Sequence, residues 1–351
     1  MASSRAPLVV CVSHPAPPEL DLGLLRELTS ALARPVELVC APYKETLALR
    51  RARRAPPPPE ALRAAAPPLD DGLRSAYARS EALLALDLPP ELVAAAARLR
   101  FVQAYSSGVE HFDLRDLARR GIALASAAGA GAPSIAEFAL ARLLEVWKCT
   151  REIEAMQRAR RMRRVETRLL AGATLGIVGL GAIGSALALR ARALGMRVLA
   201  SRRSPARGDE PVDELVGPAR RELLGLLARC DAVVLAVPDA ADTRGLLDAE
   251  ALRAMRPGAV LCNVARGSLV DEAALAEALR SGRLGAAILD VTQREPLPPE
   301  DPLWEAPNLY LSPHSAVSGE AYTRRVLELF AENLARYAAG EPLERIVAAP
   351  P

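Results

Sequence analysis

From Thr174 onward, short apolar runs alternate with stretches in which apolar residues recur every three or four positions. The runs predict buried β-strands, and the longer period predicts amphipathic helices. The predicted strands cover 174–179, 197–201, 232–237, 259–265, 286–291 and 309–312. The predicted helices cover 182–195, 219–229, 248–255 and 271–281. Such alternation is typical of a parallel, doubly wound α/β sheet.

The first half of the chain shows the same pattern less regularly. Strands are predicted at 7–12, 36–43, 82–87, 99–105 and 122–126, with a helix at 19–33. A long helix is predicted from Ser134 to about Arg163, and Ser134 with Glu137 has the spacing of a capping box. Proline clusters predict a loop without regular structure over 50–72, and a last helix is predicted at 319–339.

Composition narrows the class of protein. A chain of 351 residues is long enough for two domains, and its net charge of +3 does not favour a nucleic-acid partner. No apolar run approaches the roughly 20 residues of a membrane span. The N-terminal apolar run is too short for a signal peptide, so we expect a cytoplasmic protein. The five cysteines lack metal-site spacing, and no metal site is expected.

A glycine pattern follows the strand predicted at 174–179. Gly179, Gly181 and Gly184 form the dinucleotide fingerprint, with Ala182 and Ile183 between the last two. Gly179 would allow a tight turn, Gly181 a close approach to a pyrophosphate, and Gly184 close helix–strand packing. The strand–turn–helix context makes a turn without a ligand the weaker interpretation.

The second strand of this unit ends in a basic stretch. An acidic residue at this point normally binds the ribose hydroxyls and excludes a 2′-phosphate. Here the chain has Ser201, Arg202, Arg203 and Ser204, with no acid before Asp209. A guanidinium can bind phosphate oxygens in a bidentate way, so we predict NADP(H) with Arg202 as the main contact. Solvated arginines with NAD as the cofactor stay the alternative.

Three ionisable residues follow predicted strands further along the chain. They are Arg266, Glu295 and His314, in the segments NVARGSLVDE, DVTQREPLPPEDPLW and SPHSAVSGE. The carboxyl ends of parallel strands line the crevice that receives the cofactor. We therefore expect these three side chains to form one site.

Together these motifs resemble the D-isomer-specific 2-hydroxyacid dehydrogenase family. The resemblance covers nearly the whole chain and includes YSSGVEHFDL, GAPSIAEFALA, GLGAIG and the three segments above. REPLPPEDPLW and the arginines after the second strand are most similar to glyoxylate/hydroxypyruvate reductases. The resemblance thus implies reduction of a small 2-keto acid to the D-2-hydroxy acid by an NAD(P)H-dependent enzyme.

The family resemblance assigns a role to each residue of the expected site. His314 would be the acid/base, and Glu295 would orient its imidazole and favour the protonated form. Arg266 would bind the substrate carboxylate and polarise the keto group. Backbone amides at Ser107 and Gly108 would hold the other side of the carboxylate.

The resemblance also implies cofactor contacts outside the glycine turn. Asp290 would face the nicotinamide carboxamide. The cofactor cleft would be lined by backbone and apolar contacts from Val237, Pro238, Val264 and Ala265.

The implied fold has two doubly wound parallel-sheet domains, with a Rossmann cofactor domain inserted into a flavodoxin-like substrate domain. The substrate domain would comprise 1–127 and 318–351, and the cofactor domain 128–317. A homodimer would form through the long helix that begins near Ser134. The stretch before the cofactor domain, RARRMRRVETRLLAG, lacks the tryptophan common in the family, and GVE replaces GVD, so the substrate side chain is left open.

Other functions fit the same motifs. A relative that acts on formate or phosphite is one alternative, although a formate enzyme would have Gln at the position of Glu295. A nucleotide-sensing regulator that keeps the fold, as transcriptional corepressors of this superfamily do, is another. Turnover of 2-keto acids would distinguish an enzyme from such a regulator.

Overall fold

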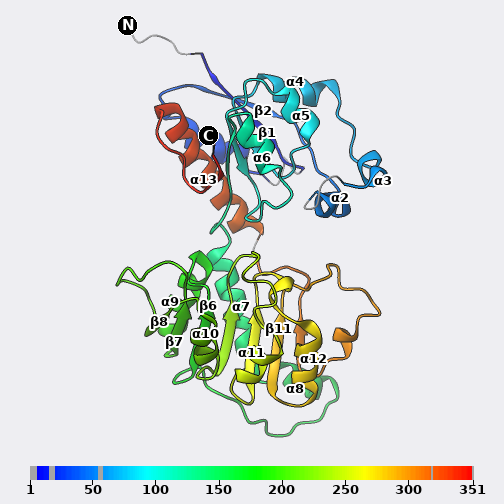
Figure 1. Cartoon of the computed structure of the whole chain (residues 1–351), viewed down its shortest axis with the longest axis vertical. Helices are drawn as coiled ribbons and strands as arrows, with labels where there is room; N and C mark the ends of the chain where they lie inside the picture. Colours follow the sequence, from blue (N-terminus) through cyan, green and yellow to red (C-terminus); the bar gives the residue numbers. More distant parts are fainter. Residues whose placement is uncertain (1–5, 16–19, 54–57, 318, 350–351) are drawn as a thin grey trace. The chain divides into compact units, whose positions relative to one another are not determined.

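The computed structural model describes residues 6–15, 20–53, 58–317 and 319–349. The chain forms two compact units, drawn in Figure 1. Unit 1 comprises residues 1–130 and 319–351, and unit 2 comprises residues 131–318. Each unit contains its own sheet with helices on both faces, which confirms the predicted α/β class with two parallel-sheet domains.

Unit 2 contains a sheet of seven parallel strands in the order β12-β11-β10-β9-β6-β7-β8. The strands are β6 (Thr174–Val178), β7 (Arg197–Ser201), β8 (Glu214–Val216), β9 (Ala232–Leu235), β10 (Ala259–Asn263), β11 (Leu284–Leu289) and β12 (Leu309–Leu311). The chain runs outward from β6 through β7 to β8 and then returns to β9 on the other side of β6. This reversal, between β6 and β9, is the point at which doubly wound α/β sheets bind ligands, at the carboxyl ends of the strands.

Helices cover both faces of the sheet of unit 2. They are α7 (Ala132–Trp147), α8 (Thr150–Arg158), α9 (Ala182–Ala193), α10 (Arg220–Leu227), α11 (Ala249–Ala254) and α12 (Glu272–Arg280). Successive strand residues point to opposite faces: Val234 packs with α7 and α9, whereas Val233 and Leu235 pack with α10, α11 and α12. Burial on both faces explains why these strands are continuous apolar runs.

Unit 1 has the strand order β13-β5-β4-β3-β1-β2. The strands are β1 (Leu8–Ser13), β2 (Val36–Cys40), β3 (Ala82–Ala85), β4 (Phe101–Ala104), β5 (Ala123–Ala125) and β13 (Ile346–Ala348). The order from β2 to β5 is that of flavodoxin-like sheets. Only β13 pairs antiparallel among the described strands of this unit.

Helices pack on both faces of the sheet of unit 1 as well. The helices of this unit are α1 (Leu22–Thr29), α2 (Leu47–Ala52), α3 (Glu60–Ala64), α4 (Asp71–Arg79), α5 (Pro90–Ala95), α6 (Leu114–Arg119) and α13 (Gly319–Ala339). The short helix α3 buries none of its residues and belongs to neither layer. On one face α1 and α13 pack against alternate residues of β1, including Leu8 and Val10. On the other face α4, α5 and α6 pack around Leu83 and Val102.

The single long helix predicted from Ser134 to Arg163 is wrong. α7 ends at Trp147, and Cys149 adopts a left-handed conformation with φ +52° before α8 begins. The predicted capping box is also wrong, because α7 begins earlier, after Gly131. Ser134 Oγ instead donates to the Ala316 carbonyl at 3.0 Å, and Glu137 forms an ion pair with Arg190 at 2.9 Å.

The prediction of no regular structure over 50–72 is wrong in part. The segment contains the end of α2, all of α3 and the start of α4, while residues 54–57 lie outside the described part. Pro59 is the N-cap of α3, and the next prolines follow the helix, so EALRA between them is free to form one turn.

Candidate functional site

The turn after β6 has the geometry that the glycine fingerprint requires. Gly179 has φ +103°, a conformation that side chains rarely adopt. A Cβ at this position would lie 2.6 Å from Val237 Cγ1 and 2.7 Å from the Ala236 carbonyl oxygen. Only glycine therefore fits where the turn packs against the end of β9.

The other two glycines shape the start of α9. A Cβ on Gly184 would lie 2.2 Å from the Gly179 carbonyl oxygen, so this glycine lets the helix pack directly on the turn. Gly181 is the N-cap of α9 and has open space where a Cβ would be. Ala182 and Ile183 begin the helix, whose first N–H groups have no intrahelical acceptors. This open cradle of backbone donors fits a pyrophosphate, as expected for a dinucleotide.

The turn is held at the end of the neighbouring strand β7. The N–H groups of Gly179 and Leu180 both donate to the Ser201 carbonyl at 3.1 Å. The segment after β9 lies on the other side, where Thr243 Oγ1 donates to the Pro238 carbonyl at 2.8 Å. The glycine turn is thus fixed between the ends of β7 and β9.

The two arginines after β7 have different surroundings. The Arg202 side chain is only 13% exposed and forms an ion pair with Glu210 at 2.5 Å. The Arg203 side chain is 68% exposed and lies 3.1 Å from Asp242. The sequence showed no acid between Ser201 and Ser204, but the loop before β8 brings the Glu210 carboxylate to Arg202.

Arg266 follows β10 in a turn organised by the buried Asn263. The Asn263 amide donates to the Arg266 carbonyl at 2.8 Å, and its Oδ1 accepts the Ala265 N–H at 3.0 Å. The guanidinium of Arg266 donates to the Ala265 carbonyl at 2.7 Å. Val264 and Ala265 are buried beside it. A polar residue at the end of an apolar strand was the available sequence signal for the role of Asn263.

His314 and Glu295 form a pair in unit 2. His314 Nδ1 lies 3.3 Å from Glu295 Oε2, and the two side chains are 52% and 30% exposed. The second carboxylate oxygen of Glu295 accepts the Thr292 N–H at 3.3 Å. His314 has φ +54°, so its backbone adopts a conformation that is uncommon outside glycine. The structure thus brings together these two predicted residues.

Asp290 anchors the segment that carries His314. Its carboxylate accepts the Ser312 hydroxyl at 2.8 Å and the N–H groups of Ser315 and Ala316 at 2.9 and 3.1 Å. Its carbonyl accepts the His314 N–H at 2.8 Å. These bonds explain how His314 is kept in its unusual conformation, a role that the sequence did not indicate.

A backbone contact joins the Arg266 turn to the loop that carries Glu295. Gly267 begins a short 3-10 turn, Gly267–Leu269. A Cβ on Gly267 would lie 2.0 Å from the Thr292 carbonyl carbon and 2.3 Å from the Gln293 nitrogen. Only a glycine permits this approach, so Gly267 sets the distance between the two loops.

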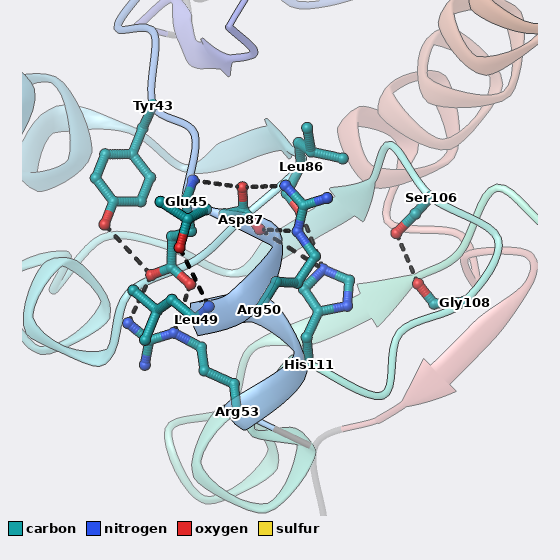
Figure 2. Close-up of polar contacts among 11 residues, drawn as sticks. Tyr43, Glu45, Leu49, Arg50, Arg53, Leu86, Asp87, Ser106, Gly108 and His111 are labelled. Carbon is teal, nitrogen blue, oxygen red and sulfur yellow. Dashed lines mark hydrogen bonds and ion pairs between the residues drawn. The ribbon is translucent and has the colours of Figure 1, made fainter. Parts of the chain in front are cut away.

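The predicted carboxylate-binding turn at Ser107 and Gly108 belongs to unit 1. Ser107 Oγ donates to the Ala127 carbonyl at 3.0 Å, and Ser106 Oγ donates to the Gly108 carbonyl at 2.6 Å. Figure 2 shows the bond between Ser106 and Gly108. It also shows a group of buried polar and charged side chains that includes His111, three residues after Gly108.

We call this group the buried ionic cluster; its members are Tyr43, Glu45, Arg50, Arg53, Asp87 and His111. Arg50 contacts both carboxylate oxygens of Asp87 at 2.6 Å. Arg53 contacts both carboxylate oxygens of Glu45 at 2.6 Å. His111 Nε2 lies 3.0 Å from the Leu86 carbonyl, and burial lowers the pKa of its imidazole. The cluster ties α2 to the ends of β3 and β4.

No group of metal-ligating residues is found in the described ranges 6–15, 20–53, 58–317 and 319–349. Among the helices of those same ranges, none is long and apolar enough to span a membrane.

The fold and this site define an NAD(P)-dependent oxidoreductase of the doubly wound α/β class. Residues 140–316 match the family described as "D-isomer specific 2-hydroxyacid dehydrogenase, NAD binding domain". The chain belongs to the D-isomer specific 2-hydroxyacid dehydrogenase family, and it is an enzyme acting on CH–OH donors.

Characterised relatives agree with this assignment. The chain is 35% identical over 268 residues to "Glyoxylate reductase" of Korarchaeum cryptofilum, covering 74% of this chain and 79% of the relative. It is 37% identical over 284 residues to "D-3-phosphoglycerate dehydrogenase" of Mycobacterium leprae, covering 77% of this chain and 51% of that protein. This chain therefore matches about half the length of the second relative.

A solved structure shows the same fold. The D-isomer specific 2-hydroxyacid dehydrogenase of Xanthobacter autotrophicus Py2, "in complex with NADPH and MES", superposes with a TM-score of 0.74 at 27% identity. The match covers 98% of each chain.

Proposed function

We propose that this enzyme reduces a small 2-keto acid of the glyoxylate or hydroxypyruvate type to the D-2-hydroxy acid, with NADPH as the preferred cofactor. The observation that carries the proposal is the His314–Glu295 pair, 3.3 Å apart and accessible to solvent. The similarity to glyoxylate reductases supports the substrate class.

In this proposal His314 donates a proton to the keto oxygen while the carbonyl carbon is reduced. The bound nicotinamide supplies the hydride. Glu295 is a positioning residue that accepts the Nδ1–H of the imidazole, which leaves Nε2 to hold the proton that is transferred. Arg266 binds the substrate carboxylate and polarises the carbonyl through its planar set of donors.

The remaining sequence-based assignments enter the proposal unchanged. The amides of Ser107 and Gly108 bind the substrate carboxylate, and Asp290 faces the nicotinamide carboxamide while it anchors the His314 segment. Val237, Pro238, Val264 and Ala265 line the cofactor site. A homodimer and a cytoplasmic location stay predictions.

Cofactor preference rests on the residues that follow β7. No carboxylate occupies positions 201–204, and the hydroxyl of Ser201 and the side chains of Arg202 and Arg203 can bind a 2′-phosphate. The solved structure of the Xanthobacter autotrophicus Py2 enzyme in complex with NADPH supports this preference.

A substrate panel tests the proposal. Oxidation of NADPH and of NADH is followed at 340 nm with glyoxylate, hydroxypyruvate, pyruvate and larger 2-keto acids. We expect the highest kcat/KM with glyoxylate or hydroxypyruvate and a lower KM for NADPH than for NADH. Preference for NADH would contradict the cofactor assignment, and no turnover of any 2-keto acid would favour the nucleotide-sensing alternative.

A further inference from the structure

The loop between β7 and β8 folds back on Arg202, the residue that is expected to bind the 2′-phosphate of NADPH. Arg202 follows the last residue of β7, whose carbonyl holds the glycine turn. The adenosine ribose of a dinucleotide lies at this strand end. The Arg202 guanidinium points into the loop, where Nε donates to the Ser204 carbonyl at 3.1 Å and Nη2 donates to the Pro205 carbonyl and to Glu210.

Glu210 lies in a small anion site. Its carboxylate accepts the Arg207 N–H at 2.6 Å, the Gly208 N–H at 2.9 Å and Nη2 of Arg202 at 2.5 Å. The backbone N–H of Arg207, with help from Gly208 and Arg202, lowers the pKa of this carboxyl to about 2. Glu210 is therefore an anion at every physiological pH.

The donors around Glu210 are those that a phosphate monoester uses. Consecutive backbone N–H groups and a guanidinium form the usual protein site for a phosphate group. The Arg202 and Glu210 side chains are only 13% and 10% exposed. An incoming 2′-phosphate must compete with this carboxylate for Arg202.

Arg203 offers a contrast. Its pair with Asp242 is exposed on both sides, at 68% and 64%, and such pairs contribute little. Arg203 can turn to a phosphate at small cost, whereas Arg202 cannot. The difference between NADPH and NADH binding thus depends on Glu210.

We propose that Glu210 occupies the phosphate-binding side of Arg202 as an internal anion, and that NADPH binds by displacing its carboxylate. The inference rests on the proposed position of the 2′-phosphate at Arg202. It makes Glu210 a specificity-determining residue, because NADH does not need the displacement.

The experiment measures dissociation constants of NADPH and NADH for the full chain by fluorescence titration. Glu210→Gln keeps the size of the side chain and removes its charge. We expect the Kd ratio of NADH to NADPH to rise about tenfold, because charge-assisted hydrogen bonds are the strong ones in proteins. The double variant Arg202→Gln with Glu210→Gln should lose this gain.

Glu214→Gln is the matched control. Glu214 lies in β8 and pairs with Arg229 at 2.7 Å, away from Arg202. The Kd ratio of NADH to NADPH in Glu214→Gln should stay within about twofold of the wild-type ratio, because ion pairs near the surface contribute little. An unchanged or lower ratio in Glu210→Gln overturns the proposal, and so does an equal loss of affinity for both cofactors. The wild-type ratio separately tests the proposed preference for NADPH.

Discussion

The buried ionic cluster of unit 1 and the His314–Glu295 pair of unit 2 combine carboxylates with nitrogen bases in opposite surroundings. The side chains of Glu45 and Asp87 are 0% exposed, and both are bound in a bidentate way by an arginine. His314 is 52% exposed, and a single contact joins it to Glu295.

Charged groups serve structure in the cluster and chemistry in the His314–Glu295 pair. A buried carboxylate that is fully paired cannot give up its partner without a large cost, so the cluster fixes geometry. The accessible imidazole of His314 leaves room for a substrate to approach it, which acid/base chemistry requires. The backbone of the His314 segment is instead held by the Asp290 carboxylate, which accepts the Ser315 and Ala316 N–H groups.

The largest effect is expected from breaking the cluster. Asp87→Ala leaves Arg50 buried without its carboxylate, and the free energy of unfolding should fall by about 3–5 kcal/mol. Chemical denaturation followed by circular dichroism measures the loss. Replacing both partners, as Arg50→Met with Asp87→Leu, should recover part of it, because no guanidinium is left unpaired while the Glu45 N–H still loses its acceptor.

The exposed pair of Glu154 and Arg158 provides the control for this experiment. These side chains are 60% and 79% exposed at 3.3 Å, so Glu154→Ala should change the free energy of unfolding by under about 0.5 kcal/mol. A loss below about 1 kcal/mol in Asp87→Ala would show that the cluster is not the rigid element we describe.

A smaller effect on stability and a selective effect on catalysis are expected at Gly267. Gly267→Ala forces the Arg266 turn away from Thr292, so kcat should fall about 10–100-fold, as expected for a shift near 1 Å. Steady-state kinetics measures the change. Gly225→Ala, on the exposed side of α10 with open space around it, should keep wild-type kcat. Equal kcat in the two variants would refute the positioning role.

The pattern of the sequence predicted most of the fold because the central strands of both sheets, such as β1, β3, β9 and β10, are buried on both faces. β8 and β13 escaped prediction since they are short, partly exposed strands that pair only at sheet edges. The break at Cys149 was hidden because apolar periodicity continues across it. Tertiary packing determines whether a residue such as Cys149 adopts the left-handed backbone conformation, and a local sequence pattern does not encode that packing.

The residues of the site likewise fall into those that the sequence pattern predicted and those that loop contacts determine. The glycine turn, Arg266, Glu295 and His314 lie in the segments that follow β6, β10, β11 and β12, and topology alone brings these segments to one edge. Glu210 acts through contacts within one loop and Gly267 through a contact between two loops, and loop geometry has no periodic signal. The carboxylate contacts of Asp290 likewise depend on where the 312–316 segment returns.

In the proposed reaction His314 transfers the proton in the reduction of a 2-keto acid. The most direct test is the turnover of His314→Ala with NADPH and the best substrate of the panel, beside its Kd for NADPH. We predict that kcat falls by about 10²–10⁴-fold, the usual contribution of a general acid, while the Kd stays within about twofold of the wild type. A kcat near the wild-type value would contradict the account.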